Sequence, residues 1–271
     1  MLRAAGIENP MYEARLLLEH FCGVSQTDIV LNREAPVDSD RAGAFLSACR
    51  RRAAFEPLQY IIGFWEFMGL KFKVNESVLI PRADTETLVE YILEKYEAPV
   101  RILDMCCGSG CIGLSLKAFL PNSDITLADI SEDALSVAQE NAKALGLSAK
   151  LVRADVMRGC EEYFDDGSFD IIVSNPPYIK SADMLRLQCE VLHEPRIALD
   201  GGEDGLKFYR ALVLYWERAL KRGGEMIFEA GFDTSGDVYS LFLECGYCDV
   251  VKRRDMNGIN RLVAGKRGSW E

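Results

Sequence analysis

The sequence has 271 residues, of which 49% are hydrophobic and 27% are charged, and its net charge is 31 − 42 = −11. This composition is typical of a folded globular protein of one or two domains and excludes a disordered or low-complexity chain. No segment reaches the roughly 18 apolar residues of a membrane span, and residues 1–12 lack the pattern of a signal peptide. We therefore expect a cytoplasmic protein with no membrane partner.

The negative charge is unevenly distributed along the chain. Residues 1–73 contain nine basic and nine acidic side chains, so residues 74–271 contain 31 − 9 = 22 basic and 42 − 9 = 33 acidic ones. Because nucleic acid binding depends largely on Lys and Arg that neutralise phosphates, nucleic acid is not expected as a direct partner. The basic run Arg50-Arg51-Arg52 is interpreted as the solvated last turn of a helix, with phosphate binding as the alternative.

The chain contains nine cysteines, an odd number without a secretory context, and we interpret them as reduced thiols. Cys106, Cys107 and Cys111 are clustered, but His20 and His193 are the only histidines and lie far away in sequence. A metal site lacks a nearby fourth ligand there, so none is expected. The clustered cysteines are interpreted as small apolar residues on a tight turn.

Helical patterns dominate the first sixty residues. One run begins at Pro10 and ends at Gly23, and a second amphipathic run begins at Asp40. They predict a small helical domain over residues 1–60. Two short aromatic-rich runs follow, Phe64 to Phe67 and Leu70 to Val74, with Met68-Gly69 between them. They predict a β-hairpin within a linker of residues 61–82.

Strands and helices alternate over residues 83–271. Helices are predicted over residues 84–95, 111–119, 131–145, 205–220 and 235–245. Strands are predicted over residues 100–104, 125–129, 150–153, 169–174, 225–230, 248–252 and 260–265. Strands separated by segments of helix length predict an α/β domain with a mostly parallel sheet and helices on both faces.

The first strand of this domain leads into a turn of small residues that opens a helix. Its residues are Asp104, Met105, Cys106, Cys107, Gly108, Ser109 and Gly110. Glycines allow the backbone to approach a ligand closely, and a helix N-terminus offers unpaired N–H groups. The pattern therefore predicts a nucleotide site, although a glycine-rich turn alone is weak support.

Acidic residues end three successive strands. Asp129 follows Asp104 by 25 residues, at a distance typical of an acid that accepts hydrogen bonds from ribose hydroxyls, and Asp155 ends the next strand. All three are expected at one ligand-binding edge of the sheet. The chain lacks a Walker-type Gly-Lys-Ser/Thr element, which disfavours a nucleoside triphosphate. A dinucleotide and S-adenosylmethionine remain as candidates.

The fourth strand runs into Asn175-Pro176-Pro177-Tyr178. Both prolines remove N–H donors, so this loop offers hydrogen-bond acceptors. The Asn175 side-chain oxygen and the Pro176 carbonyl are predicted to accept both hydrogens of a substrate NH₂ group, with Tyr178 as a flat wall. This arrangement suits methyl transfer to an amide or an exocyclic amine, while the alternative interpretation is a rigid turn.

Several motifs together resemble one enzyme family. They are Pro57-Leu-Gln-Tyr-Ile-Ile-Gly63, Ile80-Pro81-Arg82 with Asp84-Thr85-Glu86, Ile102-Leu-Asp104, Asn175-Pro-Pro-Tyr-Ile179, and Glu194-Pro195-Arg196 with Gly201-Gly202 and Gly205. The chain resembles the protein-(glutamine-N5) methyltransferases of peptide chain release factors, the HemK/PrmC family. The Asn-Pro-Pro-Tyr loop alone is shared with DNA adenine methyltransferases, whereas its combination with Ile-Pro-Arg and Glu-Pro-Arg is more specific.

The resemblance implies a Rossmann-like class I S-adenosylmethionine-dependent methyltransferase domain, with a seven-stranded sheet. It assigns the cofactor to Asp104, Cys106, Cys107, Gly108, Ser109, Gly110, Asp129, Asp155, Val156 and Asn175. It assigns the substrate to Asn175, Pro176, Pro177, Tyr178, Arg82 and Glu194, among which Asn175, Pro176 and Tyr178 are the expected catalytic residues. Glu194 is interpreted either as a proton acceptor or as one partner of a loop salt bridge. Cys106 replaces the first glycine of the family's turn, which is tolerable if its φ is negative, and the opening helix is expected to be shortened.

The expected reaction transfers a methyl group to the glutamine of the Gly-Gly-Gln loop of peptide chain release factors. Two alternatives stay open: an adenine-N6 methyltransferase acting on DNA or RNA, and a catalytically silent cofactor-binding protein. The acidic composition and the missing target-recognition insert disfavour the first. The intact Asn175 loop disfavours the second.

Overall fold

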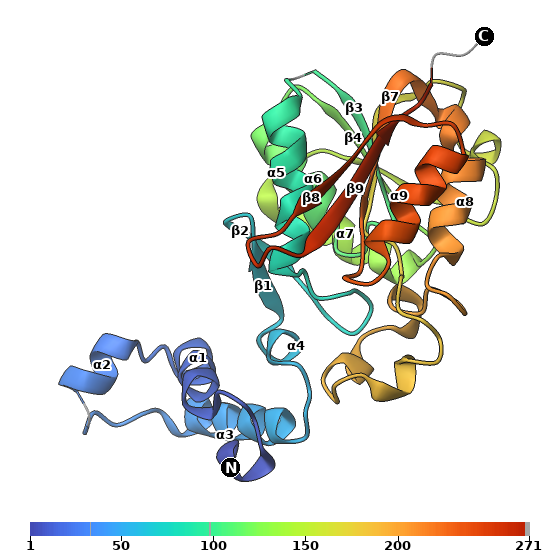
Figure 1. Cartoon of the computed structure of the whole chain (residues 1–271). Coiled ribbons are helices and arrows are strands. Elements are labelled where there is room, and N and C mark those ends of the chain that lie inside the picture. The colour runs from blue at the N-terminus through green and yellow to red at the C-terminus, as the bar shows by residue number, and fades with distance from the viewer. Residues whose placement is uncertain (33, 98, 269–271) are drawn as a thin grey trace. The chain divides into compact units, whose positions relative to one another are not determined.

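The computed structural model describes residues 1–32, 34–97 and 99–268, which Figure 1 traces in chain order. They divide into two compact units, the first formed within residues 1–64 with Gln188–His193 and the second within residues 65–187 with 194–268. The first unit therefore reaches slightly beyond the predicted edge at residue 60. Its second segment comes from far along the chain, and no local sequence signal predicts that association.

The first unit is helical. Its helices are α1 (Pro10–Cys22), α2 (Gln26–Leu31), α3 (Ser39–Ala53) and α4 (Leu58–Ile62). Gly23 ends α1 with φ of 69°, as the sequence predicts. Helix α2 was not predicted, although Ser25 and Asp28 form a capping box at its start. A small core holds these helices together, built from Leu17, Ala48, Cys49, Leu58 and Ile61.

One arginine of the basic run is not solvated. Arg52 is 2% exposed and forms ion pairs with Glu13 of α1 and with Glu190. Arg51 pairs with Glu56. Removing one partner of a buried ion pair is strongly destabilising, because the other charge remains buried. The interpretation of this run as a fully solvated turn is therefore wrong for Arg52, whose charge holds the first unit together.

The predicted β-hairpin is confirmed, with strands β1 (Phe64–Phe67) and β2 (Leu70–Lys73). Met68 and Gly69 have φ of 51° and 70°. Two successive positive φ angles are typical of the tight hairpin turns whose twist matches that of the strands.

The hairpin is part of the second unit rather than a separate linker. Phe67 and Phe72 are fully buried in its core. The Asn141 side chain accepts a hydrogen bond from the Lys73 N–H at 2.6 Å and donates one to the Lys73 carbonyl at 3.1 Å. These contacts fix β2 against the second unit, so the predicted division at residue 82 does not separate two bodies.

The second unit contains a seven-stranded sheet in the order β5-β4-β3-β6-β7-β9-β8. Its strands are β3 (Arg101–Met105), β4 (Asp124–Asp129), β5 (Lys150–Arg153), β6 (Phe169–Ser174), β7 (Leu220–Glu229), β8 (Cys248–Arg254) and β9 (Asn260–Lys266). Strand β9 is antiparallel to both of its neighbours, β7 and β8, and the other strand pairs of this sheet are parallel. The strand order reverses between β3 and β6, which is where open α/β sheets bind ligands. The predicted fold class is confirmed.

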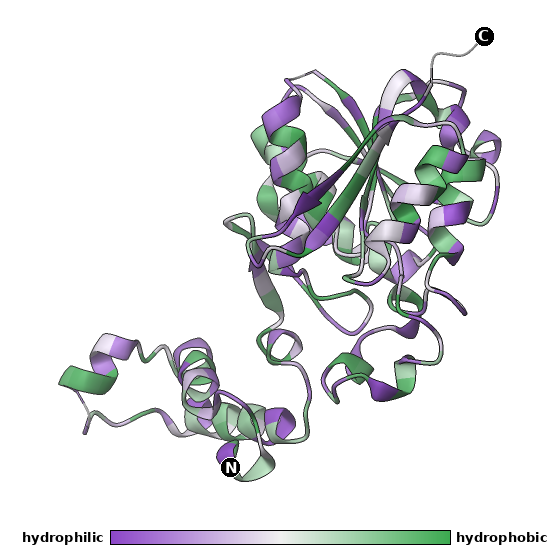
Figure 2. Cartoon of the chain, viewed as in Figure 1, coloured by the Kyte–Doolittle hydropathy of each residue, from purple (hydrophilic) through white to green (hydrophobic). Residues whose placement is uncertain are grey.

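Helices cover both faces of this sheet (Figure 1). They are α5 (Glu86–Lys95), α6 (Cys111–Phe119), α7 (Glu132–Leu145), α8 (Lys207–Tyr215) and α9 (Ser235–Glu244). Side chains alternate along a strand, so Ile102 packs into the cluster with α5, α6 and α7 while Leu103 packs into the cluster with α8 and α9. The covering helices carry apolar and polar surfaces, as Figure 2 shows.

The helix predicted over residues 205–220 is shorter in the structure. Helix α8 ends at Tyr215, and β7 already begins at Leu220. Trp216 is fully buried and its Nε1–H donates to the Val156 carbonyl at 3.0 Å, which turns the chain toward the sheet. In the ranges that the structure describes, no helix combines the length and apolar character that a membrane crossing requires.

Candidate functional site

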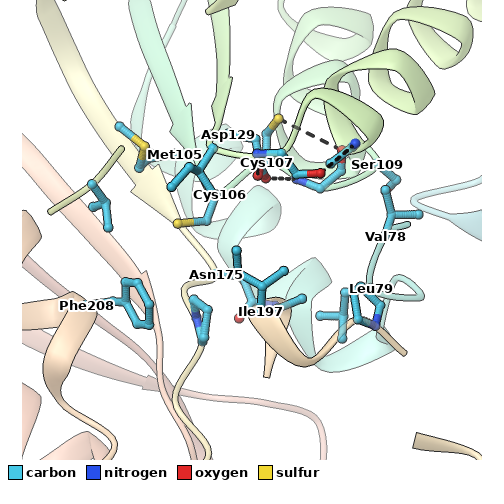
Figure 3. Close-up of a pocket in the computed structure, with 18 of the residues that line it drawn as sticks. Val78, Leu79, Met105, Cys106, Cys107, Ser109, Asp129, Asn175, Ile197 and Phe208 are labelled. Carbon is cyan, nitrogen blue, oxygen red and sulfur yellow. Dashed lines mark hydrogen bonds between the residues drawn. The ribbon is translucent and has the colours of Figure 1, made fainter. Parts of the chain in front are cut away.

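A cavity of about 310 Å³ lies in the second unit, at the carboxyl end of the sheet where the strand order reverses. This volume falls in the range of small-molecule sites. The residues assigned from the sequence that line it are Arg82, Cys106, Cys107, Gly108, Ser109, Asp129, Asp155, Val156, Asn175 and Pro177. The other assigned residues lie outside its lining, namely Asp104, Gly110, Pro176, Tyr178 and Glu194. In the view of Figure 3, Cys106 and Asp129 lie above Asn175 and Ile197.

The glycine-rich turn after β3 forms one wall of the cavity. Cys106 and Gly108 have φ of 58° and 53°. The condition of a negative φ, under which Cys106 would replace the glycine without strain, is therefore not met. The turn bends back so that the Cys107 N–H donates to the Ala128 carbonyl at 3.1 Å. A left-handed non-glycine residue costs about 1–2 kcal/mol, and the buried turn holds Cys106 in that conformation.

Gly110 serves the packing of this turn rather than the cavity. It has φ of 76° and is the N-cap of α6. A Cβ atom there would lie 3.1 Å from the Leu127 side chain and 3.3 Å from that of Ala138. Its missing side chain lets α6 start directly against β4 and α7, which sets the direction of the free N–H groups of the turn.

Asp129 is fixed at the edge of the cavity by two backbone groups. Its Oδ2 accepts a hydrogen bond from the Gly108 N–H at 3.0 Å, and its Oδ1 accepts one from the Ser131 N–H at 3.0 Å. Burial raises the pKa of Asp129, and these two bonds act in the opposite direction. Each oxygen keeps a lone pair, so the carboxylate can accept two further hydrogen bonds from a ligand.

Asp104 does not join Asp129 and Asp155 at the cavity. It is fully buried, and its Oδ2 accepts a hydrogen bond from the Gly113 N–H at 2.9 Å. Burial raises the pKa of Asp104 to about 7. The expectation that three acids face one ligand is thus wrong for Asp104. Side chains alternate along β3, so Asp104 shares the face of Ile102 and points toward α6.

Asn175 and Pro177 bring the loop after β6 to the cavity. The Asn175 Nδ2 donates to the Thr85 Oγ1 at 3.4 Å. Tyr178 was expected as a flat wall, but its ring packs against the aromatic core and its hydroxyl donates to Glu229 Oε1 at 3.3 Å. Burial raises the pKa of Tyr178. The loop is therefore anchored on both sides by polar contacts with Thr85 and Glu229.

A close backbone approach also holds this loop. The Ile179 N–H donates to the Leu199 carbonyl at 2.9 Å, and the Gly201 N–H donates to the Ile179 carbonyl at 2.7 Å. A Cβ atom on Gly201 would lie 2.6 Å from the Cα of Tyr178. Only glycine allows the two segments to pair at this distance.

We expect Gly201→Ala to destabilise the protein by about 1–3 kcal/mol, because two backbone segments must separate to admit the methyl group. Thermal unfolding measures this effect. Gly236→Ala in α9 is the matched control, since a Cβ there has no heavy atom within 4 Å and alanine favours helices. A Gly201→Ala protein that unfolds at the wild-type temperature would contradict the role given to this contact.

The two interpretations of Glu194 differ in what its carboxylate contacts. Glu194 is 6% exposed, accepts a hydrogen bond from the Ile80 N–H at 3.1 Å and forms an ion pair with Arg82. Glu194 itself is outside the cavity lining and its carboxylate is in an ion pair, which favours the loop salt bridge over a proton acceptor. Through its contacts with Ile80 and Arg82, Glu194 holds the segment that brings Arg82 to the cavity.

Several lining residues were not assigned from the sequence. They include Thr85, Ser131, Ile197, Lys207 and Phe208. Thr85 lies three residues after Arg82, in the Asp84-Thr85-Glu86 segment that the resemblance already quoted, which was a usable signal. Ile197 comes from the irregular connection between β6 and α8, which gave no helix or strand pattern, and Phe208 comes from the first turn of α8, a predicted helix that carried no signal for a site. Among the described residues, no cluster of three or more His, Cys, Asp or Glu could hold a metal ion.

Two protein families match this chain. The family described as PrmC N-terminal domain matches residues 1–63, and the one described as Methyltransferase small domain matches residues 83–205. The sequence is 40% identical over 268 residues to the release factor glutamine methyltransferase of Geobacter sulfurreducens, covering 98% of this chain and 93% of that protein. It is 42% identical over 247 residues to that of Moorella thermoacetica, covering 89% and 85%.

A solved structure shares the fold. The crystal structure of a methyltransferase from Pyrococcus furiosus matches with a TM-score of 0.56 at 17% identity, covering 85% of this chain and all of that one. At this identity the match concerns the fold alone. It agrees with the sheet order and the covering helices described above.

Proposed function

Since this chain belongs to the release factor glutamine methyltransferase family, we propose that it transfers a methyl group from S-adenosylmethionine to the side-chain amide nitrogen of a release factor glutamine. The glutamine is that of the Gly-Gly-Gln loop. The observation that supports this most is the cavity in which Asn175 and Asp129 both line the walls. Asn175 offers a neutral side-chain amide, which suits an amide substrate. Asp129 offers a carboxylate, which suits the hydroxyls of a ribose.

The residues of the cavity fit S-adenosylmethionine. Asp129 keeps free lone pairs for two ribose hydroxyls, and the turn at Gly108 leaves open space where a Cβ would stand. Val156 and Ile130 add apolar surface for an adenine ring. When bound, S-adenosylmethionine supplies an electrophilic methyl group on a positively charged sulfur.

A glutamine nitrogen is a poor nucleophile because its lone pair is delocalised into the carbonyl. The chain must therefore act mainly by positioning. The Asn175 side-chain oxygen and the Pro176 carbonyl are proposed to accept the two N–H groups and to hold the nitrogen toward the methyl group. Accepting these hydrogens favours a localised lone pair as the nitrogen becomes pyramidal. Glu194 lies outside the cavity lining and is paired with Arg82, so the proton is proposed to leave late, to solvent.

The direct test is methyl transfer from labelled S-adenosylmethionine to purified release factor, with duplex DNA and single-stranded DNA as competing acceptors. We expect label on the release factor, at a single glutamine that peptide mass spectrometry identifies. Methylation of adenine without methylation of release factor would instead establish the adenine-N6 alternative. Cofactor binding with no transfer to either acceptor would establish the silent binding protein.

We expect the apparent affinity for the release factor to weaken as salt rises. Residues 74–271 carry the whole net charge of −11, and the glutamine loop of a factor that approaches ribosomal RNA is expected in basic surroundings. Screening beyond a Debye length of about 8 Å at physiological ionic strength weakens such attraction. Titrating KM against salt measures it, and a short Gly-Gly-Gln peptide, which lacks the basic domain, is expected to be a poorer and less salt-sensitive substrate.

A salt-independent KM for the intact factor would contradict electrostatic attraction. Equal kcat/KM for peptide and intact factor would contradict recognition of the partner's body. Neither result would affect the chemistry proposed at Asn175, because that chemistry concerns the loop alone.

A further inference from the structure

Two buried polar side chains, Thr85 and Glu229, and the half-buried Asn175 are linked by hydrogen bonds at the cavity. Thr85 is 2% exposed and Glu229, the last residue of β7, is 1% exposed. The Thr85 hydroxyl is in hydrogen-bond contact with Glu229 Oε2, and the Asn175 Nδ2 lies 3.4 Å from the Thr85 Oγ1. Neither Thr85 nor Glu229 was assigned from the sequence, and neither has a role in the methyl transfer proposed above.

The direction of these hydrogen bonds follows from the number of protons available. A threonine hydroxyl has one proton, and an ionised carboxylate can only accept. The Thr85 proton is therefore committed to Glu229, so Thr85 can only accept from Asn175. An amide that turns its NH₂ group toward Thr85 must turn its oxygen away, toward the other side of the side chain.

The second oxygen of Glu229 is also occupied. Tyr178 donates its hydroxyl proton to Glu229 Oε1 at 3.3 Å. The Tyr209 hydroxyl donates to the Glu229 backbone carbonyl at 2.8 Å, which fixes the backbone from α8. The carboxylate thus connects both ends of the Asn175-to-Tyr178 loop, through Thr85 at one end and through Tyr178 at the other.

We propose that Glu229 and Thr85 are positioning residues that fix the Asn175 amide with its oxygen toward the substrate. This inference rests on the proposed function, because it concerns the acceptor that Asn175 offers to the glutamine NH₂ group. An inverted Asn175 amide would point its own NH₂ hydrogens at those of the glutamine NH₂ group and would repel the substrate. The orientation therefore decides whether the cavity accepts an amide at all.

The orientation depends on the ionisation of Glu229. Burial raises the pKa of Glu229 to about 7, and the hydrogen bonds from Thr85 and Tyr178 act against that rise. Among the neighbouring charges, Arg261 of β9 favours the ionised form and Asp84 disfavours it. Arg261 itself pairs with Asp84 at 3.0 Å and with Asp255 at 3.1 Å.

Below this pKa the hydrogen bonds that link Glu229, Thr85 and Asn175 can reverse their donor and acceptor roles. A protonated Glu229 can donate to Thr85, and the Thr85 hydroxyl can then donate to Asn175, which must turn its oxygen inward to accept. The competent fraction then falls by up to about tenfold per pH unit, the limit reached when every protonated molecule inverts. We expect kcat to fall with a slope up to that limit on the acidic side of about pH 7, while the Kd for S-adenosylmethionine changes little.

The first test compares variants of the whole chain. Glu229→Gln carries no titratable proton, so its kcat is expected to lose the acidic limb of the pH profile. Thr85→Val removes the hydroxyl at nearly constant volume and is expected to lower kcat about ten- to a hundredfold, with recovery of most of it in Thr85→Ser. Thr126→Val, the same change at a buried position of β4 outside the cavity lining, is the matched control.

The second test needs no turnover. In wild-type protein with ¹³C-labelled glutamate and ¹⁵N-labelled asparagine, the Glu229 carboxyl carbon and the Asn175 Nδ2 resonances are expected to shift with one common midpoint. Spectra of Glu229→Gln and Asn175→Asp assign the two signals. The inference is overturned if Asn175 stays unchanged while Glu229 titrates, or if the acidic limb persists in Glu229→Gln.

These outcomes separate the inference from the proposed function. Wild-type methylation of release factor at pH 8 with unaltered kcat in Thr85→Val would overturn only the inference. A wild-type protein that never methylates release factor would overturn the function, and the resonances would still decide the orientation of Asn175.

Discussion

An Asn175→Ala variant is expected to transfer methyl groups at least about a hundredfold more slowly than the wild type, because one positioning contact with fixed geometry is lost. The side chain is half-buried at the cavity wall, and its one described hydrogen bond, to Thr85, is long at 3.4 Å. Folding should thus change little. Single-turnover methyl transfer to release factor measures the rate, and calorimetry with S-adenosylmethionine shows whether cofactor binding persists.

Asn122→Ala is the matched control, since Asn122 is exposed in the turn before β4 and lies outside the cavity lining. It is expected to behave as the wild type in both measurements. An Asn175→Ala protein with near wild-type turnover would show that the Asn-Pro-Pro-Tyr loop is structural in this chain. A loss of cofactor affinity equal to the loss of rate would move Asn175 from the substrate to the cofactor.

Asp129→Ala is expected to weaken S-adenosylmethionine binding about ten- to a hundredfold, or about 1.5–3 kcal/mol, through the loss of charge-assisted ribose hydrogen bonds. The change also releases the N–H groups of Gly108 and Ser131, which loosens the turn. Both effects reduce affinity. Titration calorimetry with S-adenosylmethionine and its demethylated product measures it.

The opposite end of the same strand offers the control. Asp124 is the first residue of β4 and is exposed, whereas Asp129 is the last. Asp124→Ala removes an equal charge without touching the cavity and should leave the Kd unchanged. If Asp129→Ala keeps wild-type affinity, the ribose is bound elsewhere and the assignment of this carboxylate is wrong.

The central strands were predictable because their signal is local. The strands predicted over residues 100–104, 125–129 and 169–174 match β3, β4 and β6 to within one residue at each end. Each is an apolar run; β3 ends at a turn of small residues, β6 at two prolines and β4 at Asp129. The carboxyl ends of parallel strands meet at one edge of the sheet, so the sequence could also predict that Cys107, Asp129 and Asn175 line one cavity.

Side-chain direction was harder to predict than position. Asp104 ends a strand like Asp129, yet it points to α6 and is buried. The alternation along β3 contains this information, because Asp104 shares the parity of Ile102. Cys106 is a different case: its residue type favours negative φ, and only the closed turn imposes a left-handed backbone.

By itself the sequence determined the family, the alternation of strands and helices and the two loops that carry Gly108 and Asn175, since these depend on residues adjacent in the chain. The tertiary structure alone decided which distant side chains meet. Arg52 is buried and pairs with Glu190, 138 residues away, and Thr85 contacts Glu229 across 144 residues. Hydrogen bonds and ion pairs are short-ranged, so such pairs arise only when the folded backbone has brought their elements together, and no local pattern records them.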